Sequence, residues 1–240
     1  MKRPEDIRAA PKEWIALLQV ACRFFWEEKI GDLLLYGSQA MSVYMKNPLR
    51  SKDLDFLSSQ VSYRQVETLA DRLSEIKGVE QRTTSAQART LEHGRMTTFA
   101  IELRVNGKPF FVELFDRVLD GRSPSVLQPH ILQTRRWGLE FWSPAREAIV
   151  VLRLAFRQPE GITRLNAIRL NRFIQENQES LRFKLVREII TEWGIEDWVE
   201  KNLVNLYSRN NIRILNDGKI IRGIERKIDG KQTATTASLP

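Results

Sequence analysis

Two stretches of the chain repeat apolar residues with the spacing of an amphipathic helix. Residues 12–29 place large apolar side chains on one helical face, and polar residues occupy the opposite face. Residues 62–77 repeat this pattern after Ser59 or Ser62, either of which can cap a helix, and Gly78 is a typical residue after a helix end. We therefore expect two helices that pack against a sheet. The apolar face of the first consists of Trp14, Ile15, Leu17, Leu18, Ala21, Cys22, Phe25 and Trp26, and that of the second of Val66, Leu69, Leu73 and Ile76.

Other segments have the period of two that is typical of β-strands. Residues 33–36 form an apolar run short enough for a buried strand, and residues 53–56 alternate between polar and apolar. Residues 97–105 and 108–116 flank Asn106-Gly107, a pair that strongly predicts a tight hairpin because both positions favour positive φ. The pattern predicts an α/β (α+β) fold, with a mixed sheet, helices on one side, and a helical C-terminal part.

The hairpin turn also fixes which residues face each other. Counting outward from Asn106-Gly107, Ala100 lies opposite Glu113, and Phe111 and Phe115 are the neighbours of Glu113 on the same face. A carboxylate between two phenylalanines on a buried strand is costly unless a charged partner lies nearby. Glu113 is therefore expected to face a cation.

Asp53 and Asp55 provide the other half of this arrangement. In a strand they point to the same face, roughly 6.5–7 Å apart along the backbone. Two like charges at that distance repel unless a cation or a basic group lies between them. Magnesium takes oxygen ligands and bridges to phosphates, so we predict a magnesium site at Asp53, Asp55 and Glu113. Asp116 is the alternative third carboxylate, which a strand bulge would bring to the same face.

The turn before these aspartates suits a phosphate. Gly37-Ser38 joins the apolar strand to a helix start, where Ser38 can act as the cap and the free backbone N–H groups can face an anion. The following basic loop ends at Lys52. We predict that Gly37, Ser38 and Lys52 bind the phosphates of a nucleotide. The alternative is that Arg50 and Lys52 only pair with the two aspartates.

Composition restricts the remaining chemistry. The 240 residues include one cysteine and two histidines, which excludes an internal disulfide and disfavours a zinc site built on those residues. The formal net charge of +8 is consistent with a polyphosphate or nucleic-acid partner. The chain has no apolar run long enough to cross a membrane, and its N-terminus lacks a secretory pattern. We expect a cytoplasmic protein.

The pattern Gly37-Ser38 followed by Asp53-x-Asp55 resembles the signature of the DNA polymerase beta-like nucleotidyltransferase superfamily. Within it, Arg50-Ser51-Lys52-Asp53-Leu54-Asp55 resembles the form found in abortive-infection and MenT-type toxin nucleotidyltransferases. The resemblance implies two magnesium ions, a nucleoside triphosphate, release of pyrophosphate, and an acceptor hydroxyl such as that of tRNA or other RNA. It also implies an antitoxin-like protein partner. Glu113 departs from the aspartate that is more frequent at the third ligand position.

The second half of the chain carries helical patterns. Residues 121–142 look irregular, and we expect a helix that begins at Ser143-Pro144 and carries Arg153 and Arg157 on one face. In the resembling branch a lysine and an arginine occupy this helix, so Arg153 and Arg157 are candidate triphosphate ligands or ordinary surface arginines. Asn166 occupies the place of an aspartate found there.

The predicted domains are residues 1–142 and 143–230, followed by a disordered tail at 231–240. A basic segment from Lys201 onward is a candidate nucleic-acid surface or a solvated helix face. The Arg153 and Asn166 departures also favour an alternative function, a catalytically silent protein that keeps the fold and binds nucleic acid or another protein.

Overall fold

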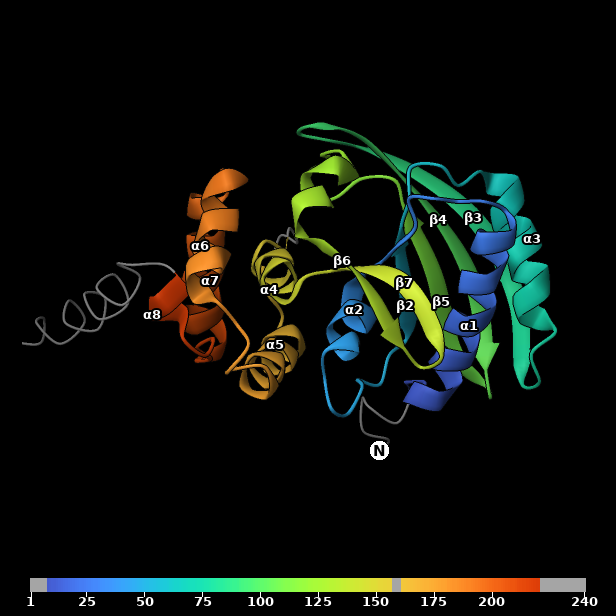
Figure 1. The fold of residues 1–240 in the computed structure, drawn as a ribbon, viewed down its shortest axis with the longest axis horizontal. Helices are drawn as coiled ribbons and strands as arrows, with labels where there is room; N and C mark the ends of the chain where they lie inside the picture. The colour runs from blue at the N-terminus through green and yellow to red at the C-terminus, as the bar shows by residue number, and fades with distance from the viewer. Residues whose placement is uncertain (1–7, 157–160, 221–240) are drawn as a thin grey trace, which may run out of the picture. The chain divides into compact units, whose positions relative to one another are not determined.

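A seven-stranded mixed sheet organises the first part of the chain in the computed structural model, which describes residues 8–156 and 161–220 (Figure 1). The strand order is β3-β4-β5-β2-β1-β7-β6, with parallel pairing in β2–β5 and β1–β7 and antiparallel pairing elsewhere. This confirms the predicted mixed sheet. The strands are β1 (Leu34–Leu35), β2 (Asp53–Leu57), β3 (Val79–Leu91), β4 (Gly94–Val105), β5 (Lys108–Phe115), β6 (Ile131–Arg136) and β7 (Leu139–Pro144).

The predicted hairpin is confirmed with its register. Val105 pairs with Lys108 and Ala100 pairs with Glu113, as a two-residue turn requires. The turn residues Asn106 and Gly107 have φ values of 50° and 76°. The register therefore places Glu113 on the sheet face that the sequence predicts.

Helices α1 (Pro11–Glu27) and α3 (Tyr63–Ser74) pack on the opposite face of the sheet (Figure 1). Ser62 caps α3 through a capping box with Gln65, which confirms one of the two predicted cap positions. The apolar stripes of both helices join the inward side chains of the central strands in one core. Its largest fully buried side chains include Trp14, Phe25, Phe56 and Phe110.

Two expectations about the connecting segments are wrong. The stretch expected to be irregular contains a 3-10 helix, η1 (Pro124–His130), and the hairpin β6–β7. Its turn, Trp137-Gly138, takes φ values of 54° and 74°, a left-handed pair that the sequence hides because tryptophan rarely adopts it. Ser143-Pro144 ends β7 and does not begin a helix, since Pro144 pairs with Ile131 and α4 begins at Arg146.

Residues 146–156 and 161–220 form a second, helical unit, which confirms the predicted helical C-terminal part. Thr163 caps α5 by accepting from the backbone N–H of Asn166. The predicted division at residues 142 and 143 stays a prediction, and the predicted tail lies outside the described residues. The helices are α4 (Arg146–Leu154), α5 (Arg164–Glu176), α6 (Phe183–Glu192), α7 (Glu196–Asn210) and α8 (Asp217–Ile220).

Across the described ranges, no helix has both the length and the apolar character needed to cross a bilayer.

Candidate active site

The pairing of β2 with β5 brings the three predicted carboxylates together. Asp55 lies directly across from Glu113 in the parallel register, and Asp53 is two residues earlier on β2. One ligand oxygen from each of Asp53, Asp55 and Glu113 lies within 4.8 Å of those of the other two. All three side chains are partly exposed, so the group, which we call the carboxylate trio, can be reached from solvent. An oxygen-only set of this kind suits magnesium.

Gly37 allows this arrangement because a side chain there would collide with the trio. A Cβ atom built at Gly37 would lie 1.7 Å from Asp55 Oδ2, far inside any van der Waals contact. Gly37 also has a φ of 63°, which glycine adopts without cost. It is the first residue of α2 (Gly37–Val43). The backbone at Gly37 therefore lies directly against the Asp55 carboxylate.

The predicted capping role of Ser38 is wrong. Tyr36 occupies the cap position of α2 and makes no side-chain cap bond, which leaves Ser38 inside the first turn. The Ser38 hydroxyl instead lies 2.9 Å from Ser51 Oγ and 3.5 Å from Asp53 Oδ1. Ser38 thus lies beside the trio, where its hydroxyl contacts the side chains of Ser51 and Asp53.

The electrostatics of the trio identify a basic residue that sequence reasoning missed. Burial, followed by the nearby charge of Asp53, raises the pKa of Glu113. The positive charges of Lys52 and Arg89 act in the opposite direction on the pKa of Glu113, which places both near its carboxylate. Arg89 lies on β3, which pairs with β4. The sequence does not clearly predict a strand at β3, so it does not predict this pairing either.

Asp116, the alternative third carboxylate, has a different role. Its Oδ1 accepts a 2.7 Å hydrogen bond from the backbone N–H of Thr97, and its own N–H donates to the Thr97 carbonyl. These bonds extend the β4–β5 pairing past the end of β5. The Asp116 side chain thus binds the backbone of Thr97. The third member of the carboxylate cluster with Asp53 and Asp55 is Glu113.

The two predicted arginines belong to the other unit. Arg153 lies in the last turn of α4, half-buried, and its Nη2 has no hydrogen-bond partner among the described residues. Arg157 lies outside the described residues. A nucleotide-binding role for either arginine stays a prediction.

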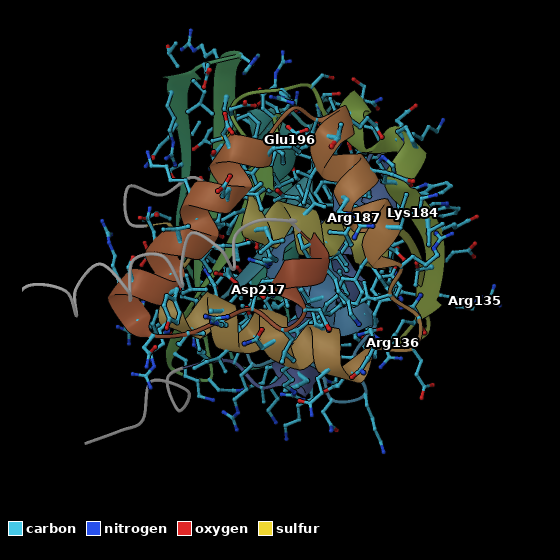
Figure 2. The ribbon with its side chains drawn as sticks, turned by 90° about the vertical axis from the view of Figure 1, so that its left-hand side faces the viewer. Arg135, Arg136, Lys184, Arg187, Glu196 and Asp217 are labelled. Carbon is cyan, nitrogen blue, oxygen red and sulfur yellow. The ribbon has the colours of Figure 1, made fainter. Side chains whose placement is uncertain are left out.

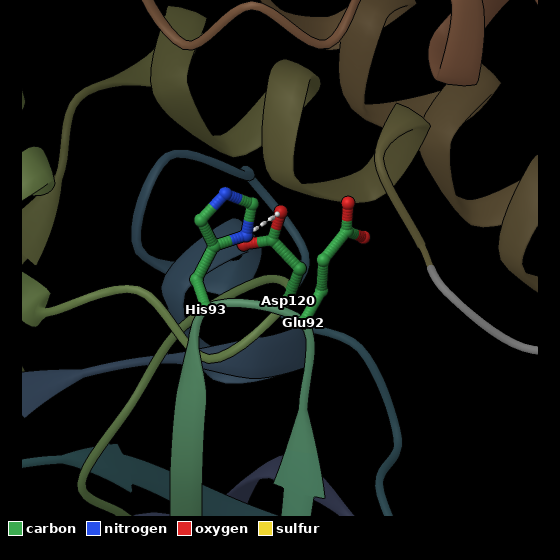
Figure 3. A group of neighbouring side chains, drawn as sticks. All are labelled: Glu92, His93 and Asp120. Atoms are coloured by element: carbon green, nitrogen blue, oxygen red, sulfur yellow. Dashed lines mark ion pairs between the residues drawn. The ribbon is translucent and has the colours of Figure 1, made fainter.

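A second cluster joins Glu92, His93 and Asp120, and its ligand atoms also lie within 4.8 Å of one another (Figure 3). Asp120 is 2% exposed, and the guanidinium of Arg122 binds both of its oxygens, at 2.9 and 3.2 Å. His93 Nδ1 lies 2.9 Å from Asp120 Oδ2, and the His93 backbone N–H donates to the Asp120 carbonyl. This cluster connects the β3–β4 turn to the loop after β5, and its buried charge is already balanced.

The basic segment predicted from Lys201 onward lies only partly within the described residues. Lys201 and Arg209 lie on α7, Arg213 follows that helix, and Lys219 lies on α8. Arg222, Arg226 and Lys227 lie outside the described residues, and a nucleic-acid role for this segment stays a prediction.

A separate hollow of mixed charge lies along α6. Lys184 and Arg187 project from this helix (Figure 2), where they line an open hollow of about 540 Å³ together with Glu188, Thr191 and Glu192. Lys184 pairs with Glu188 at 3.6 Å, and Arg187 donates to a backbone carbonyl. Alternating charges of this kind do not form a continuous phosphate-binding stripe.

The fold resembles several solved structures at low sequence identity. A candidate nucleotidyltransferase of H. pylori aligns with a TM-score of 0.49 and 12% identity, covering 92% of this chain and 98% of its own. An antigenic nucleotidyltransferase-like protein of Paracoccidioides brasiliensis has a TM-score of 0.44 and 15% identity, with coverages of 86% and 96%. The antibiotic-resistance factor ANT(2'')-Ia has a TM-score of 0.42 and 12% identity, with coverages of 82% and 93%.

No protein-family model matches the chain, and no curated protein matches its sequence. At these levels of likeness, conclusions about function depend on the side chains themselves.

Proposed function

We propose that this protein is a magnesium-dependent nucleotidyltransferase, which moves a nucleoside monophosphate from a nucleoside triphosphate to an acceptor hydroxyl. The single observation that supports this most is the carboxylate trio, with one oxygen from each of Asp53, Asp55 and Glu113 within 4.8 Å of the others. Three carboxylates this close repel each other strongly unless cations are bound. A metal ion that arrives with the substrate would relieve this repulsion.

In this proposal, Asp53 and Asp55 hold two magnesium ions, and Gly37, Ser38 and Lys52 contact the phosphates. The ions would supply Lewis-acid stabilisation of the charge that develops on the attacking and leaving oxygens. The acceptor oxygen forms a bond to the α-phosphorus while the bond from that phosphorus to the bridging oxygen breaks, and pyrophosphate leaves. Glu113 would be the third carboxylate ligand of the ion that activates the acceptor hydroxyl, and it would accept the proton of that hydroxyl.

RNA, including tRNA, is our candidate acceptor, and the net charge of +8 is consistent with an anionic partner. An antitoxin-like protein partner and contacts from Arg153 and Arg157 to the triphosphate remain predictions of the family resemblance.

The test is to incubate the full chain with magnesium, each α-labelled triphosphate in turn, and either cellular RNA or the chain alone. We expect label transfer that depends on magnesium and is lost in Asp53→Ala. Asp71→Ala, which removes an exposed acid on α3, is the matched control and should retain transfer. Transfer that survives in Asp53→Ala would refute the assignment. A chain that binds neither magnesium nor any triphosphate would favour the catalytically silent alternative.

A further inference from the structure

Two buried serine hydroxyls form a hydrogen-bonded chain that ends on Asp53. Ser51 Oγ lies 2.7 Å from Asp53 Oδ1 and 2.9 Å from Ser38 Oγ. A hydroxyl has one proton to donate, and an ionised carboxylate can only accept. Ser51 therefore donates to Asp53 and accepts from Ser38, whose hydroxyl also lies 3.5 Å from Asp53 Oδ1.

Ser51 has little freedom to move. It is 1% exposed, and both of its backbone groups bond to Ala9. The Ala9 N–H donates to the Ser51 carbonyl at 2.7 Å, and the Ser51 N–H donates to the Ala9 carbonyl at 3.1 Å. The Gln39 side chain donates to the backbone carbonyl of Asp53. Both the backbone and the carboxylate of Asp53 are thus held by groups that are themselves fixed in place.

We propose that Ser51 is a positioning residue, which holds the Asp53 carboxylate in the orientation that binds a divalent ion. A hydrogen bond to Oδ1 restricts rotation about the Cβ–Cγ bond and so also directs Oδ2. This inference rests on the proposed function, because it assigns to Asp53 the role of a metal ligand. Partners of this kind typically contribute about 10- to 100-fold to metal affinity.

Ser38 plays a different part in the same chain. Its hydroxyl lies 2.9 Å from Ser51 Oγ and a longer 3.5 Å from Asp53 Oδ1, so an incoming phosphate oxygen can accept its proton while the 2.7 Å bond from Ser51 to Asp53 remains. Losing the Ser38 hydroxyl should therefore affect the triphosphate, whereas losing the Ser51 hydroxyl should affect the metal.

Ser58 provides a matched control. It is 4% exposed, lies just after β2, and donates its hydroxyl proton to the carboxylate of Asp32, which is outside the trio. Ser58→Ala therefore removes the same type of buried serine–aspartate bond from the same unit. A purely structural effect of losing such a bond should appear equally in both serine variants.

The experiment is a titration of the full chain with Mn²⁺ in the absence of nucleotide, in which electron paramagnetic resonance measures the bound Mn²⁺. We expect Ser51→Ala to weaken Mn²⁺ binding at least about 10-fold, with Ser51→Thr near the wild-type value because it keeps the hydroxyl. Ser58→Ala should bind Mn²⁺ like the wild type. If Ser51→Ala does not fold, Ser51→Cys replaces it, since a thiol is a weak donor of similar size.

Steady-state kinetics complete the test. Ser51→Ala should raise the magnesium concentration needed for half-maximal transfer, and Ser38→Ala should raise the KM for the triphosphate while leaving Mn²⁺ affinity near wild type. Equal Mn²⁺ affinities in the wild type and Ser51→Ala, with transfer intact, would overturn the positioning role alone. Absence of both Mn²⁺ binding and transfer in the wild type would overturn the proposed function together with it.

Discussion

The two acidic clusters of the first unit look alike in composition but differ in how their charge is balanced. The cluster around Asp120 contains its own cation, because Arg122 binds both oxygens of a carboxylate that is 2% exposed. The carboxylate trio has three acids, and Lys52 and Arg89 only partly offset the effect of burial and of Asp53 on Glu113.

This difference separates a structural cluster from a candidate catalytic one. An ion pair that satisfies both carboxylate oxygens leaves little for a metal to gain, because binding would first have to displace the guanidinium. Carboxylates that crowd one another are in the opposite situation, because a bound cation relieves their repulsion. Geometry alone, which is similar in both clusters, would not distinguish them.

The sharpest test of the comparison is to remove one acid from each cluster without changing its shape. Asp53→Asn should reduce nucleotidyl transfer by about 10³-fold, since metal-centred charge stabilisation is worth several kcal/mol and each 1.36 kcal/mol is tenfold in rate. Asp120→Asn should retain most of the transfer activity of the folded protein. Equal losses of kcat/KM in the two variants would remove the distinction.

A second test uses the close contact between Gly37 and Asp55. Gly37→Ala should lower metal affinity by about 10- to 100-fold, because its Cβ would lie 1.7 Å from Asp55 Oδ2. Its positive φ should also cost roughly 1–2 kcal/mol of folding free energy. Gly138→Ala is the control, since Gly138 has a φ of 74° and nothing within 4 Å of a built Cβ. Similar metal affinities in the two variants, measured by titration calorimetry, would contradict the steric argument.

The structural cluster should respond in stability. Asp120→Ala leaves the Arg122 guanidinium, 20% exposed, without its buried carboxylate, and should lower the free energy of unfolding by about 2 kcal/mol. Urea denaturation measures this. The exposed pair Arg135–Glu140 provides the reference, and Glu140→Ala should change stability by less than about 0.5 kcal/mol. An unchanged free energy of unfolding in Asp120→Ala would show that this cluster does not stabilise the fold.

The sequence was informative where local rules decide the structure. Asn106-Gly107 fixed the register that places Glu113 opposite Ala100, and β2 alternation placed Asp53 and Asp55 on one face. The approach of Asp55 to Glu113, by contrast, depends on parallel pairing of β2 with β5, and the order of strands in a sheet is not a local property.

The errors have a related origin. The β6–β7 hairpin was missed because its turn places Trp137 at positive φ, against the usual preference, and tertiary contacts stabilise it: Trp137 packs edge-on against Trp14 at 5.1 Å. Ser38 was misplaced because its partner Ser51 is 13 residues away in sequence and reaches it only through the fold. Arg89 was missed for the same reason, since its proximity to Glu113 is a property of the assembled sheet.

The smallest expected effect concerns the stability of the metal-free protein. Burial and Asp53 raise the pKa of Glu113 in the folded state, so between its unfolded and folded pKa values the folded chain binds more protons than the unfolded one. Stability should therefore fall as pH rises through that interval, and at neutral pH the ionised Glu113 is a cost. Glu113→Gln should raise the melting temperature at pH 7 in chelator and have little effect at pH 4. Adding magnesium should reverse the order at pH 7, because the metal stabilises the chain that keeps its third carboxylate.

A matched substitution in the cluster around Asp120 should change the melting temperature in the opposite direction. Asp120→Asn should lower the melting temperature with or without magnesium. If Glu113→Gln is destabilising in chelator at pH 7, the crowding of the trio is not a cost to the fold, and the contrast between the two clusters fails.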